Sequence, residues 1–94
     1  MPAAILTFHL RLIGCSSLKE KRSIIKPMLT RLHKEFNLSA AEVDLQDHWQ
    51  EVVITCAMAG NEHVFLERAM HQVLDFMARQ WPDYPIFSEN IEIW

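Results

Sequence analysis

Alternation of apolar and polar residues opens the chain and predicts a β-strand over Ala3–Ile13. Successive side chains of a strand point to opposite faces of a sheet. One set is fully apolar and should pack against helices: Ala4, Leu6, Phe8, Leu10 and Leu12. The other set is mixed, which predicts a face that is only partly covered: Ile5, Thr7, His9, Arg11 and Ile13.

A helical period follows the break at residues 14–17. Its apolar stripe consists of Ile25, Met28, Leu29, Leu32 and Phe36. Ser17 and Glu20 have the spacing of a capping box, which favours a helix that begins at Leu18. That start places Lys21 near the apolar stripe, and Pro27 favours a later start because proline is tolerated near a helix amino end. Ser23 is therefore a second candidate cap, and the sequence leaves both starts open.

The second half of the chain predicts two strands joined by a turn. In Leu38–Leu45 the apolar residues Ala41, Val43 and Leu45 alternate with Glu42 and Asp44. Residues 46–49 fit a hairpin turn. Residues 51–59 are apolar on both faces, which is typical of a central strand.

A second helix and a last strand complete the pattern. Asn61 is a candidate cap and Pro82 a stop signal. The apolar stripe between them comprises Leu66, Ala69, Met70, Val73, Phe76 and Met77. A final strand is expected within Ile86–Trp94, with Ile91 and Ile93 on one side.

This order of elements predicts one α+β domain over residues 1–94: a ferredoxin-like β-α-β-β-α-β sandwich. Its four-stranded antiparallel sheet should carry both helices on one face, because right-handed crossovers bring them to the same side. Half of the residues are apolar, as expected of a globular chain. The chain lacks a basic leader and any apolar run of membrane length, so we expect a cytoplasmic protein with no membrane contact. Cys15 and Cys56 have no metal-binding spacing and should be free thiols.

Charge divides the chain unequally. Residues 1–34 contain seven Lys/Arg and one acid, a net charge of +6. Residues 35–94 contain two Lys/Arg and eleven acids, a net charge of −9. Such asymmetry is typical of a polyanion-binding side, or of two faces that attract each other or a partner subunit.

The junction of the first strand and first helix is the main candidate site. A helix amino end attracts anions, and basic side chains would strengthen that attraction. The candidate polyanion-binding residues are Arg11, Ser17, Lys19, Lys21, Arg22 and Lys26. A solvated helix start with intrahelical pairs to Glu20 would explain the same charges.

Two protein contacts are also predicted. The hairpin residues Gln46, Asp47, His48 and Trp49 form a candidate partner-binding tip, since tryptophan is favoured at interface hot spots. Packing of Trp49 over the sheet edge is the alternative. The open sheet face could join two copies of the chain into a homo-oligomer.

Catalytic chemistry has weaker signals. His63, Glu67 and His71 recur every fourth residue, but exposed helix positions explain them as well as a metal site does. We therefore expect no metal, no cofactor and no catalytic residue. An acylphosphatase-like enzyme has the same fold but would need a glycine-rich phosphate loop, which Gly14 alone does not provide.

The segments Ser17-Leu-Lys-Glu-Lys-Arg22, Phe36-Asn37 and Ala41-Glu-Val-Asp-Leu-Gln-Asp-His-Trp-Gln50 resemble the bacterial family of unknown function numbered 503, the YlxP-like proteins. The likeness covers nearly the whole chain. It implies a ferredoxin-like fold and a bacterial cytoplasmic protein, whose gene often lies among genes for translation initiation and small-subunit ribosome maturation. We expect a non-enzymatic accessory module that contacts ribosomal RNA or a ribosome-associated protein. A small-molecule or acyl-phosphate-handling domain is the alternative.

Overall fold

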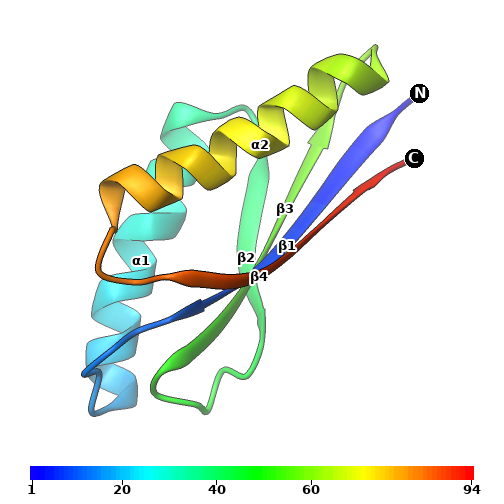
Figure 1. The fold of residues 1–94 in the computed structure, drawn as a ribbon. Helices are drawn as coiled ribbons and strands as arrows, with labels where there is room; N and C mark the ends of the chain where they lie inside the picture. The colour runs from blue at the N-terminus through cyan, green and yellow to red at the C-terminus, as the bar shows by residue number, and fades with distance from the viewer.

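The computed structural model describes residues 1–94 and has the predicted order of elements. These are β1 (Ala3–Arg11), α1 (Leu18–Glu35), β2 (Ser39–Asp44), β3 (Glu51–Ala59), α2 (His63–Gln80) and β4 (Ile86–Ile93). The strands form one antiparallel sheet in the order β2-β3-β1-β4. Both helices cover the same face of the sheet and leave the other face open (Figure 1). The α+β ferredoxin-like fold is therefore confirmed.

The core lies between the sheet and the two helices. All five apolar residues of the first predicted set are completely buried: Ala4, Leu6, Phe8, Leu10 and Leu12. The alternate residues of β1 range from half-buried to exposed, as a partly covered open face requires. Strand β3 is central, and Val52, Val53 and Ile54 are all buried.

Helix α1 begins at Leu18, and the later start at Ser23 is wrong. Ser17 is the cap residue, and its side-chain oxygen accepts a hydrogen bond from the Glu20 amide at 3.1 Å. Pro27 lies inside the helix and is exposed. The helical stripe therefore continues back to Lys21, which is buried with Ile25, Met28 and Leu32.

Strand β2 differs from the predicted alternation. Glu42 pairs with Ile54, but Asp44 pairs with the adjacent Val53, so Val43 forms a bulge between them. A bulge adds one residue and changes the face to which later side chains point. Glu42 therefore shares the helix-covered face of Ile54, whereas Asp44 shares the open face with Val53. The sequence pattern had placed both acids on one side.

Helix α2 buries seven apolar residues: Leu66, Ala69, Met70, Val73, Leu74, Phe76 and Met77. Its cap residue is Glu62 and not the predicted Asn61, and no side chain caps it. Neither helix has the length and apolar character needed to span a bilayer.

The two ends of the chain meet at the start of β1, where the Trp94 amide donates to the Ala3 carbonyl at 2.8 Å. The loop between β2 and β3 lies at the opposite end of the molecule (Figure 1).

Candidate functional site

Lys21 organises the end of the molecule where α1 meets the β2–β3 loop. Its side chain is almost completely buried, with 1% of the residue exposed. The ammonium nitrogen lies 2.8 Å from the Leu45 carbonyl, 2.6 Å from that of His48 and 3.0 Å from that of Glu51. Glu42 Oε2 lies 2.9 Å away as the counter-charge. Three ammonium protons face four oxygens, and Glu42 Oε2 has no hydrogen bond of its own.

The β2–β3 loop is consequently fixed on both sides of its tip. Besides the three carbonyls bound by Lys21, the Gln50 side chain donates to the Cys15 carbonyl at 3.1 Å. The Leu12 amide donates to the Gln50 carbonyl at 2.7 Å. Leu45 has a positive φ of 54°, a conformation that costs a non-glycine residue on the order of 1 kcal/mol and persists where surrounding contacts enforce it. The Lys21 contacts supply that enforcement.

Lys21 therefore does not belong with the exposed cations of the predicted polyanion site. A buried charge is tolerated only when it is paired and hydrogen-bonded, and Lys21 meets both conditions within the chain. The sequence carried one signal of this role, since a lysine stood near the apolar stripe. The partner, Glu42, carried no such signal, because the bulge that follows it cannot be read from the alternation.

The amino end of α1 is closed by its own residues. Glu20 Oε2 accepts hydrogen bonds from the Ser16 amide at 3.1 Å and from the Ser16 hydroxyl at 3.0 Å. Ser17 accepts from the Glu20 amide, as described above. The carboxylate of Glu20 thus lies where an anion would bind at a helix amino end. Ser17 serves as a cap and not as a free anion ligand.

Three candidate cations remain together on the outer face of α1. At about 100° per residue, Lys19, Arg22 and Lys26 fall within an arc of about 60°. All three are exposed, and we call them the basic stripe. The two acids of α1, Glu20 and Glu35, project outside this arc. The stripe therefore presents positive charge without an acid from its own helix.

Arg11 lies apart from the basic stripe, on the open sheet face. Its guanidinium is 3.6 Å from Glu51 and stacks over the Phe87 ring at 4.7 Å from the centroid. The structure therefore divides the six predicted polyanion-binding residues. Lys19, Arg22 and Lys26 share one surface, whereas Arg11, Ser17 and Lys21 have other contacts.

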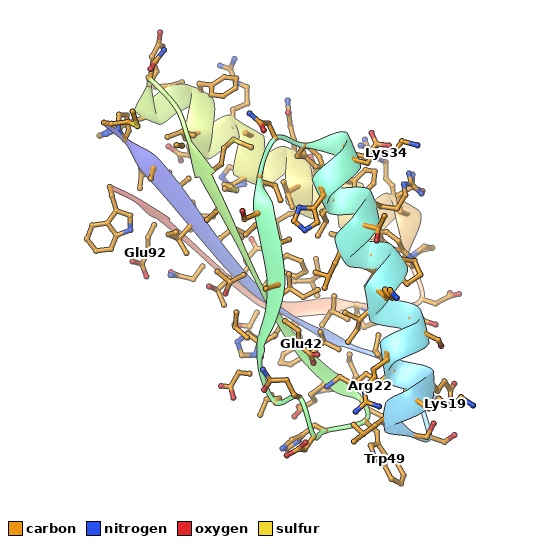
Figure 2. All side chains as sticks on the ribbon, turned by 180° about the vertical axis from the view of Figure 1, so that it is seen from behind. Lys19, Arg22, Lys34, Glu42, Trp49 and Glu92 are labelled. Atoms are coloured by element: carbon orange, nitrogen blue, oxygen red, sulfur yellow. The ribbon has the colours of Figure 1, made fainter.

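A groove runs beside the basic stripe, between α1 and the edge strand β2. Its volume is about 440 Å³. Residues of both elements line it: Arg22, Ile25, Lys26, Leu29, Thr30, His33, Ala40 and Glu42. Figure 2 shows Glu42 on the side of β2 that faces α1, with Arg22 and Lys19 toward the end that carries the loop.

Trp49 lies at the tip of the fixed loop, at the same end as Lys19 and Arg22 (Figure 2). The residue is 53% exposed, so it does not pack fully over the sheet edge. The other candidate partner residues, Gln46, Asp47 and His48, are exposed too. A shallow hollow of about 650 Å³ adjoins the ring and is lined by Arg11, Asp47, His48, Trp49, Gln50 and Glu51.

Other chemistries find little support in the geometry. No group of three or more His, Cys, Asp or Glu side chains is arranged to hold a metal ion, so the spacing of His63, Glu67 and His71 gains no support. Cys15 and Cys56 are free but buried. Desolvation by burial raises the pKa of Cys56 to about 12, which keeps this thiol protonated at neutral pH and unsuited to nucleophilic attack.

Comparison with known proteins agrees with the sequence resemblance. The model of the family "Protein of unknown function (DUF503)" matches residues 3–91. The chain is also similar to the uncharacterized protein YlxP of Bacillus subtilis (strain 168), with 39% identity over 61 residues. That match covers 65% of this chain and 66% of the Bacillus protein, just under two thirds of the relative's length. The chain belongs to the DUF503 family.

Proposed function

We propose that the chain is a non-enzymatic module that binds RNA phosphates along the basic stripe of α1. One observation carries this proposal: Lys19, Arg22 and Lys26 are exposed on one arc of a helix from which both acids of that helix are excluded. Unpaired cations on one surface attract a phosphate backbone and release its counterions. Helix α1 is held against the sheet by its buried residues, so the stripe is a fixed surface.

The net charge of −3 limits the strength of such binding. Acids elsewhere on the chain repel a polyanion, so the contact should be local and sensitive to salt. Three phosphate contacts predict that log K falls with log salt with a slope of about −2 for a single strand. Ribosomal RNA is the first RNA to test, because the family resemblance implies a gene context of ribosome maturation. A ribosome-associated acidic protein is the competing partner.

An acyl-phosphate-handling enzyme is not favoured by this geometry. Such an enzyme needs an open anion cradle between the first strand and the first helix. Here the Glu20 carboxylate accepts the hydrogen bonds of the Ser16 amide and hydroxyl at that junction.

Fluorescence anisotropy with a labelled single-stranded RNA tests the proposal. The RNA is about 12 nucleotides long, which is within the usual site size of such binders. The decisive variant is Arg22→Ala/Lys26→Ala. Its matched control is Arg68→Ala/Arg79→Ala, which removes the same charge from exposed positions of α2. We expect weaker binding and a flatter salt slope for the α1 variant only. Equal losses in both variants, or no binding by the parent at low salt, would contradict the proposal.

A further inference from the structure

We infer that Trp49 is a stacking platform for an unpaired base of the RNA whose phosphates lie on the basic stripe. This inference rests on the proposed function and names its ligand class: single-stranded RNA, held by one base and its neighbouring phosphates. It assigns a role to the hollow beside Trp49, which phosphate binding alone leaves unused.

The first argument is the contrast between the fixed backbone and the exposed ring. Lys21 binds the carbonyls of His48 and Glu51, which flank Trp49, and Gln50 is bound to both Leu12 and Cys15. Four hydrogen bonds of this kind would be unnecessary for a mobile surface turn, yet Trp49, which they hold in place, is 53% exposed. An aromatic ring that is fixed in place loses little entropy when a base stacks on it.

The second argument is the chemistry of the hollow. Arg11 and Gln50 offer donors, while Asp47, Glu51 and Gln50 offer acceptors. Carboxylates accept hydrogen bonds from exocyclic amino groups of bases. The pairs that now engage Glu51 are long, 3.6 Å to Arg11 and 3.9 Å to His48, and they are exposed, so a base edge can replace them at small cost.

The third argument is the arrangement of charges. Positive charge lies on α1 and acceptors lie beside Trp49, at one end of the molecule (Figure 2). A nucleotide carries a group for each surface: an anionic phosphate for the positive charge and a base with donor groups for the acceptors. An acidic protein would match the stripe but would bring only further carboxylates to Asp47 and Glu51, whereas a base brings donor groups to them. A regular duplex keeps its bases stacked and cannot present one to the ring.

Trp49→Ala tests the inference, with Trp94→Ala as the matched control. Trp94 is 70% exposed and lies at the opposite end of the molecule. Anisotropy is measured with single-stranded oligoadenylate, with an RNA duplex of similar length and with polyglutamate. We expect Trp49→Ala to weaken binding to oligoadenylate by about 10-fold, Trp49→Phe to retain part of it, and Trp94→Ala to change nothing. The duplex and polyglutamate should bind more weakly and without dependence on Trp49.

The outcomes separate the two proposals. If Arg22→Ala/Lys26→Ala weakens oligoadenylate binding and Trp49→Ala does not, the stacking role is wrong and phosphate binding stands. If neither variant changes binding, both proposals fall. If polyglutamate binds as tightly as oligoadenylate and depends on Trp49, the ligand is an acidic protein and the inference is overturned. Indole fluorescence in Trp81→Phe/Trp94→Phe should be quenched by oligoadenylate, and an unchanged signal would contradict stacking directly.

Discussion

Helices α1 and α2 have the same length and cover the same face of the sheet, but they differ in what they bury. Helix α2 buries seven apolar residues and no charged one. Helix α1 buries three apolar residues and a lysine. The comparison shows that α2 mainly supplies hydrophobic stabilisation, whereas α1 devotes one of its core positions to fixing a loop.

The same contrast extends to the outer faces and the amino ends. Helix α1 is capped by Ser17 and carries the basic stripe, while α2 begins at Glu62 without a side-chain cap. Lys21, which fixes the loop, and Lys19, which is exposed, are only two residues apart in the sequence. Lys21 and Lys19 are separated by about 200° around the helix, which turns one inward and the other outward.

The largest effect should come from Lys21→Met, which removes the charge and keeps an apolar stem. It leaves three carbonyls and Glu42 without their partner. We expect a loss of about 3–5 kcal/mol in the free energy of unfolding, as for other broken buried pairs. Urea denaturation measures it. Lys26→Met is the matched control on the exposed side and should change stability by less than about 0.5 kcal/mol.

Glu42→Gln should have a smaller effect, about 1–2 kcal/mol, because the ammonium keeps its three carbonyl partners. The double variant Lys21→Met/Glu42→Met should be less destabilised than the sum of Lys21→Met and Glu42→Met, because it removes both charges. A double-mutant cycle by denaturation gives the coupling. Strict additivity would mean that Glu42 and Lys21 do not act as a pair.

Substitutions of the cap residues of α1 and α2 should change the stability of the protein in opposite directions. Ser17→Ala removes the cap of α1 and should cost about 1 kcal/mol, whereas Glu62→Ser gives α2 a cap and should gain about 0.5 kcal/mol. Thermal unfolding of both variants measures the difference. A loss in both would show that Glu62 stabilises α2 in some other way.

The smallest effect should come from the outer faces. Arg22→Ala/Lys26→Ala and Arg68→Ala/Arg79→Ala should each stay within about 0.5 kcal/mol of the parent, since surface charges contribute little to stability. Denaturation midpoints check this. A large loss of stability in the α1 variant would mean that any change in its RNA binding comes from unfolding.

The fold could be predicted from the sequence because periodicity reports burial directly. The alternation around Phe8 and the helical stripes around Met28 and Met70 place most of the observed core correctly. The exceptions are Leu29 and Phe36, which are only partly buried, and Leu74, which is buried but was not predicted to be. The site could be predicted only in part. The exposed cations of the first helix followed from charge counting, but the burial of Lys21 depends on three carbonyls and Glu42, which lie 21 to 30 residues away. Contacts at that separation leave no local pattern.

Binding of RNA at the α1 end is the central claim, and nuclear magnetic resonance tests it most directly. Single-stranded oligoadenylate is titrated into the labelled protein while amide and indole signals are followed. We predict shifts at Lys19, Arg22 and Lys26 and at the indole of Trp49, while the indoles of Trp81 and Trp94 and the exposed face of α2 stay unchanged. Shifts centred on α2, or no shifts at low salt, would contradict the account.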